Sequence, residues 1–99
     1  MDITYKTRNL KKICNDAKAA EKAHGREMAK VIHQRIDQIT AADNVEMLVC
    51  SHIGRCHLLK NNRKGQYAVD LVHPYRLVFE KRDDGMIQIA HILEIVDYH

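Results

Sequence analysis

The chain has little of several things that would mark a special class of protein. It has no tryptophan, one proline and three cysteines among 99 residues, and no segment is repeated or of low complexity. No apolar run approaches the roughly 20 residues that cross a bilayer, and residues 1–20 lack the basic-then-apolar order of a signal peptide. A chain of this length builds one hydrophobic core. We therefore expect one soluble, cytoplasmic domain over residues 1–99 with no contact to a membrane.

Several catalytic motifs are also absent. The sequence contains no glycine-rich phosphate loop, no HExxH and no GxSxG, so nucleotide hydrolysis, zincin chemistry and α/β-hydrolase chemistry lose their usual support. An odd number of cysteines favours reduced thiols over a disulfide scaffold. Structural zinc sites use two well-separated ligand pairs, whereas the candidates here fall within eight residues: Cys50, His52, Cys56 and His57. We expect neither a metal nor another cofactor.

Charge is unevenly placed along a chain whose net charge is only +3. Residues 51–69 contain no acid and four basic residues, which are Arg55, Lys60, Arg63 and Lys64. Residues 83–99 contain four acids and no Lys or Arg. A local basic patch is typical of proteins that bind polyanions. Taken alone, it fits a solvated hairpin equally well.

Hydrophobic spacing predicts the elements of the N-terminal half. Residues 2–5 alternate enough for a short strand, and a helical pattern then runs from Asn9, its expected N-cap, to a stop at Gly25. A second helix is predicted over 26–39, where apolar residues line one face. The short turn between the two helices predicts an antiparallel hairpin. His24 is interpreted as a surface residue.

The second half follows the two-residue period of strands. One more helical turn is expected between residues 41 and 53. Four strands are then predicted at 55–60, 66–72, 75–80 and 86–96, with turns at 61–65 and 83–85. The result is an α+β fold, in which an N-terminal strand and a helical hairpin pack on a twisted antiparallel sheet.

Some polar residues on these strands suit the cleavage of RNA. They are His57, Arg76, Asp97, Tyr98 and His99, beside Lys60, Arg63 and Lys64. RNA supplies its own nucleophile, the 2′-hydroxyl, so cleavage needs an acid, a base and cations rather than a metal-bound water. Histidine can serve as acid or base near neutral pH, and arginine holds two phosphate oxygens at once. Tyr67 and Tyr98 are candidates for stacking on an unpaired base.

Each of these residues also has a purely structural interpretation. His57 could face solvent, and Asp97 could cap an element or form an ion pair. Arg76 should point to the opposite side of its strand from its apolar neighbours, where it could pair with Asp70 or Glu80. Tyr98 could close the edge of the core. From spacing alone, both sets of interpretations stay open.

Four segments together resemble the HigB-type toxins, also called plasmid-maintenance killer proteins, of the RelE/ParE superfamily. They are residues 54–60, 63–69, 74–79 and 94–99, which read GRCHLLK, RKGQYAV, PYRLVF and EIVDYH. The resemblance is sharp over residues 54–99. One departure lies in the basic turn, where Asn61 replaces the usual glycine. Because Asn tolerates positive φ better than most residues, we expect the turn to survive.

The resemblance implies a fold, an activity and partners. It implies the RelE/ParE-like microbial RNase fold, ribosome-dependent cleavage of mRNA in the decoding site, and neutralisation by a HigA-type helix-turn-helix antitoxin. Carried over residue by residue, the catalytic group falls on His57, Asp97, Tyr98 and His99, with Arg76 near the phosphate. Lys60, Arg63, Lys64 and Tyr67 would contact RNA.

Two other functions fit the same sequence. One is a ParE-like inhibitor that binds gyrase and cuts no nucleic acid, although such a toxin has no need for the acid–base set. The other is a small RNA-binding module without activity, which would use the basic residues equally well. Cleavage products in translated mRNA would separate the nuclease from both.

Overall fold

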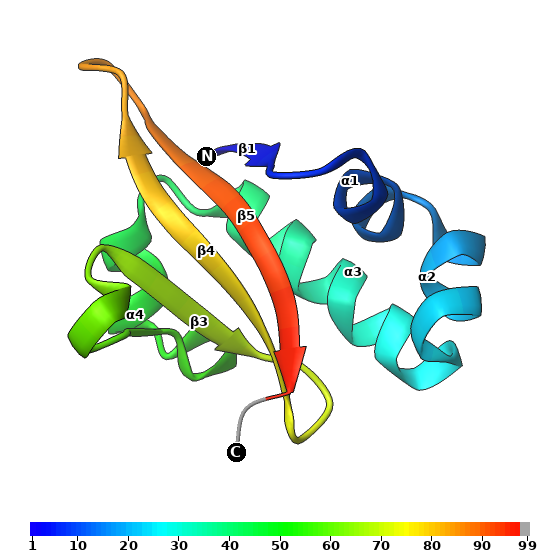
Figure 1. The fold of residues 1–99 in the computed structure, drawn as a ribbon. Coiled ribbons are helices and arrows are strands. Elements are labelled where there is room, and N and C mark those ends of the chain that lie inside the picture. The colour runs from blue at the N-terminus through cyan, green and yellow to red at the C-terminus, as the bar shows by residue number, and fades with distance from the viewer. Residues whose placement is uncertain (98–99) are drawn as a thin grey trace.

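The computed structural model describes residues 1–97 of the chain, arranged as helices packed on one face of a five-stranded sheet (Figure 1). The N-terminal half contains β1 (Asp2–Tyr5), α1 (Arg8–Asn15), α2 (Ala17–His24), α3 (Arg26–Ala41) and α4 (Val45–Cys50). The second half contains the 3₁₀ turn η1 (Ile53–Arg55), β2 (His57–Leu58), the 3₁₀ turn η2 (Asn61–Arg63), β3 (Gln66–Asp70), β4 (Tyr75–Asp83) and β5 (Gln88–Asp97).

The first predicted helix is in fact two helices. Thr7, rather than Asn9, is the N-cap of α1, and its hydroxyl accepts a hydrogen bond from the backbone N–H of Leu10 at 3.0 Å. Asp16 then interrupts the chain in an extended conformation. Its carboxylate caps α2 by accepting a hydrogen bond from the backbone N–H of Lys18 at 2.9 Å. Aspartate stabilises the N-terminus of a helix in this way, whereas in the middle of a helix it competes with the backbone hydrogen bonds.

The sheet has the strand order β1-β5-β4-β3-β2. The neighbours from β2 to β5 are antiparallel, as predicted, whereas β1 pairs with β5 in parallel. The strand predicted over 55–60 is reduced to His57–Leu58, because Gly54 and Arg55 have positive φ and form a 3₁₀ turn. No helix among residues 1–97 is long and apolar enough to span a membrane.

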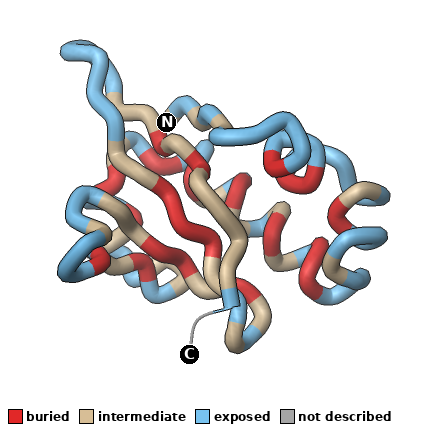
Figure 2. Tube along the Cα trace, in the orientation of Figure 1, coloured by how far each residue is buried: buried red, intermediate tan, exposed pale blue. Residues whose placement is uncertain are grey.

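The core lies between α3 and one face of the sheet (Figure 2). Ile32 and Ile39 of α3 are fully buried, as are Leu77, Phe79 and Ile92 on β4 and β5. A smaller cluster of Leu59, Ala68 and Val78 lies on the opposite face. We call this opposite side, which carries Ala68 and Val78, the open face.

Candidate functional site

Strand register sets out two rows of side chains on the open face. Residues directly opposite each other on paired strands share a face. The first row is His57, Ala68, Val78 and Glu94. The second row is Asp70, Arg76 and Val96. His57 and Arg76 therefore share the open face, two strands and one row apart.

The His57 ring is held in a defined orientation. Nδ1 lies 2.9 Å from the backbone carbonyl oxygen of Arg55. A carbonyl only accepts, so Nδ1 carries the proton in the neutral ring and Nε2 is the basic nitrogen. The preceding Cys56 is buried, which raises the pKa of its thiol to about 11. That thiol therefore stays protonated near neutral pH.

Two arginines meet one carboxylate beside His57. Arg76 Nε lies 3.3 Å from Asp70 Oδ1, and Arg55 Nε lies 3.0 Å from Asp70 Oδ2. Asp70, one of the two partners expected for Arg76 in its structural interpretation, is therefore confirmed as its ion-pair partner. Arg35 of α3 fixes the same strand by donating from Nε to the Asp70 carbonyl oxygen at 2.7 Å. Two guanidinium groups thus share the Asp70 carboxylate at this end of the open face.

Arg63 reaches over the open face from η2. Its guanidinium donates to Glu94 Oε1 and to Gln66 Oε1, both at 3.2 Å. Asn61 takes a φ of 62°, so the expected tolerance of Asn for this turn is confirmed. Lys60 and Lys64 flank the turn and are exposed. The basic turn thus places one ordered arginine, held by Glu94 and Gln66, with two exposed lysines beside it.

A groove of about 570 Å³ continues along the open face from Arg63. Its lining includes Arg82, Glu80 and His91. Burial, and next the charge of Arg82, lowers the pKa of His91, so its ring is neutral near pH 7. The groove therefore contains charges of both signs and a neutral histidine.

Other predicted site residues lie apart from these rows. Tyr67 belongs to the helix-covered face, where its ring stacks on Phe79 with centroids 5.7 Å apart. Asp97 is the register partner of Tyr75, on the face opposite to Arg76. Two strands separate β2 from β5, a span of roughly 14 Å at ordinary strand spacing, so the structure does not bring His57 into contact with Asp97. Tyr98 and His99 lie outside the described residues.

Comparison with known proteins identifies the fold. No protein-family model and no curated protein sequence matches the chain. Among solved structures, the YoeB/ParE toxin from Agrobacterium tumefaciens superposes with a TM-score of 0.67 at 13% identity, with 100% of both chains covered. The YoeB dimer from Staphylococcus aureus gives 0.63 at 25% identity, over 100% of this chain and 97% of that one. This chain has the YoeB/ParE toxin fold.

The S. aureus protein also matches as part of its YoeB–YefM complex, with a TM-score of 0.63 and 24% identity over 100% of this chain and 97% of that one. The predicted α+β, RelE/ParE-like fold is therefore confirmed. The HigB type within the superfamily stays a prediction.

Two residues of the open face in this YoeB/ParE fold were missed as site residues. Arg55 joins Asp70 and Arg76, although it lies in η1, before β2 begins. Glu94 holds Arg63. For Arg55 the signal was its position two residues before His57 in the strand predicted over 55–60, where alternate residues share one side. The Arg63–Glu94 pair joins residues 31 positions apart and has no local signal.

Proposed function

We propose that the protein is the toxin of a type II toxin–antitoxin system, of HigB type, and acts as a ribosome-dependent endoribonuclease on translated mRNA. The observation that carries this is His57, with Nε2 as its basic nitrogen, on the open face beside Arg55 and Arg76. The YoeB/ParE toxin fold supports the toxin function.

The open face supplies parts of a metal-independent cleavage reaction. The RNA 2′-hydroxyl attacks the adjacent phosphorus, one group removes its proton, and another protonates the leaving 5′-oxygen. Nε2 of His57 performs one of these transfers. Arg76 and Arg55 stabilise the charge that develops on the phosphate oxygens. In this proposal the second acid–base group comes from the C-terminal residues Asp97, Tyr98 and His99.

The basic turn contacts the RNA around the cut in this proposal. Lys60 and Lys64 bind phosphates of mRNA or of ribosomal RNA in the decoding site, and their exposure leaves them accessible for it. Arg63 binds with a planar, already positioned guanidinium. Tyr67 is a weaker candidate, because its ring is stacked on Phe79 on the other face.

An antitoxin is the expected protein partner. The S. aureus YoeB structures include a heterotetrameric complex of YoeB–YefM toxin–antitoxin. By analogy, a cognate antitoxin binds this chain, and the sequence resemblance favours a HigA-type protein with a helix-turn-helix. Co-expression with the cognate antitoxin should abolish growth arrest and yield a stable complex on gel filtration.

Ribosomes programmed with a defined mRNA test the proposed activity, and primer extension locates the cuts. We expect discrete cuts within translated codons, and a loss of roughly 10²- to 10⁴-fold in rate for His57→Gln. His99→Ala should also lose toxicity while keeping the far-UV CD spectrum. Arg8→Lys, an exposed change on α1, is the matched control and should cut normally.

Three results would contradict the proposal. Full toxicity of His99→Ala would show that His99 takes no part in catalysis. Double-strand DNA breaks without mRNA cuts would indicate ParE-like inhibition of gyrase. RNA binding without cutting on programmed ribosomes would indicate an RNA-binding module.

A further inference from the structure

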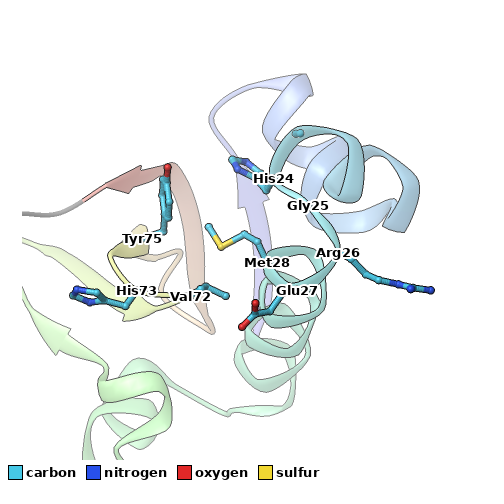
Figure 3. A pocket seen from close by; sticks show the side chains of 9 residues that line it. His24, Gly25, Arg26, Glu27, Met28, Val72, His73 and Tyr75 are labelled. Carbon is cyan, nitrogen blue, oxygen red and sulfur yellow. The ribbon is translucent and has the colours of Figure 1, made fainter.

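A cavity of about 400 Å³ lies between the turn that joins α2 to α3 and the loop that joins β3 to β4 (Figure 3). His24 points toward the ring of Tyr75, and the thioether of Met28 points into the cavity. Val72 contributes to the wall from the loop. The volume falls within the range of small-ligand sites.

The lining suits a flat aromatic group. The rings of His24 and Tyr75 stand 6.5 Å apart at 62°, an edge-to-face arrangement, and Tyr75 is 38% exposed. Met28 is buried and gives a polarisable, apolar floor. A planar ligand can therefore stack on Tyr75 while it covers Met28.

The charged residues at the rim disfavour a phosphate. Glu27 supplies a carboxylate on this side of the cavity, and Arg26 points away from it. A carboxylate repels phosphate but accepts hydrogen bonds from the N–H groups of a nucleobase. Glu27 thus offers the base of a nucleotide an acceptor that its phosphate cannot use.

The position of the cavity connects it to the open face. Tyr75 is the first residue of β4, and the next residue, Arg76, is in the second row on the opposite face. Asp97 is the register partner of Tyr75. The cavity therefore opens at the same end of the sheet as the arginine pair.

We propose that this cavity binds a nucleobase of the RNA that flanks the scissile phosphate, with Tyr75 as its stacking platform. The proposal rests on the endoribonuclease function proposed above. Arg76 holds the phosphate on one side of the sheet end, and the neighbouring base stacks on the exposed part of the Tyr75 ring on the other. The binding residues are Tyr75, His24 and Glu27, none of which was predicted as a site residue.

A coupling experiment tests this subsite. The substrates are mRNAs on programmed ribosomes that carry a single abasic nucleotide at each position flanking the cut. We expect one abasic position to slow cleavage by the unsubstituted protein by roughly 5- to 150-fold, the range of base–aromatic stacking. Tyr75→Ala should show the same loss on intact mRNA and no further loss on that abasic mRNA. Tyr75→Phe keeps the ring and should behave normally.

Met86→Ala is the matched control, because Met86 is exposed at the hairpin tip, the far end of the sheet. The subsite would be overturned if Tyr75→Ala and each abasic position slowed cleavage independently, so that their fold-losses in rate multiplied when the variant was tested on abasic mRNA. Normal cleavage by a folded Tyr75→Ala protein, checked by far-UV CD, would overturn it too. Absence of cleavage by the unsubstituted protein would instead refute the proposed nuclease function.

Discussion

Gly54 is the position where one added methyl group should disturb the candidate site most. Gly54 lies in η1, three residues before His57, with φ 53° and ψ 29°. A Cβ at this position would lie 2.6 Å from Arg35 Nε. That nitrogen donates the 2.7 Å hydrogen bond to the Asp70 carbonyl oxygen. Gly54→Ala must therefore displace the guanidinium that ties α3 to the strand carrying Asp70.

The expected cost has two parts. A side chain in the left-handed region costs about 1–2 kcal/mol. Losing a hydrogen bond from a charged donor costs about 1.5–3 kcal/mol. Together these predict a loss of about 2.5–5 kcal/mol in the free energy of unfolding, with the lower end expected if Arg35 finds a new partner. A loss of 2.5 kcal/mol corresponds to a fall in Tm of roughly 10–20 °C for a domain of this size.

Urea unfolding followed by far-UV CD measures the change. Gly85→Ala is the matched control: its φ is 92° and a Cβ there meets no atom within 4 Å, so only the backbone cost of about 1–2 kcal/mol applies. In an Arg35→Ala background, Gly54→Ala should fall to the same cost. An undiminished effect of Gly54→Ala in that background would refute the proposed contact.

Three further predictions concern charge, thiols and phosphate binding. Hydrogen bonds from Lys81 and nearby groups lower the pKa of Glu46 from 4.5 to about 2, so the stabilisation is present above pH 4.5 and disappears as the pH falls toward 2. The stability advantage over Glu46→Gln in acid titrations should therefore vanish across that window. Of the three thiols, Cys50 alone is exposed, so Ellman's reagent should label one thiol quickly in the native protein and three in urea. Arg76→Lys should slow mRNA cleavage at least tenfold, because an ammonium lacks the bidentate geometry of guanidinium, whereas Arg8→Lys should not.

Local patterns predicted most of the elements because hydrophobic period and glycine placement decide them. They failed at Asp16, where the apolar residues keep helical spacing although the helix is broken between α1 and α2. A capping carboxylate there competes with the helix through backbone contacts that the apolar pattern does not register. The parallel pairing of β1 with β5 was also missed, because it joins the two ends of the sequence, such as Asp2 with Ile89, and has no local signal.

The alternation of side chains along a strand explains which site residues could be assigned to a face of the sheet. Arg76 was expected to point away from its apolar neighbours, and it does. Tyr67 was predicted to stack on an RNA base, but it shares its face with Val69 and Leu71, which are buried against the helices, so its ring lies on the core side. For Asp97 the alternation fails, because a bulge between Val78 and Phe79 makes an extra residue on β5 and reverses the faces beyond it.

That bulge determines how the two halves of the proposed site are arranged. Without it, Asp97 would fall on the face of Arg76; with it, Asp97 is paired with Tyr75 on the side of the helices. A substrate that uses both Arg76 and the Tyr75 cavity must therefore pass around the end of the sheet. Duplex RNA is too stiff and too wide to do so, whereas a single strand can turn and extend one unstacked base into the cavity. The geometry thus favours single-stranded RNA, which is the form of mRNA in the decoding site before a tRNA pairs with it.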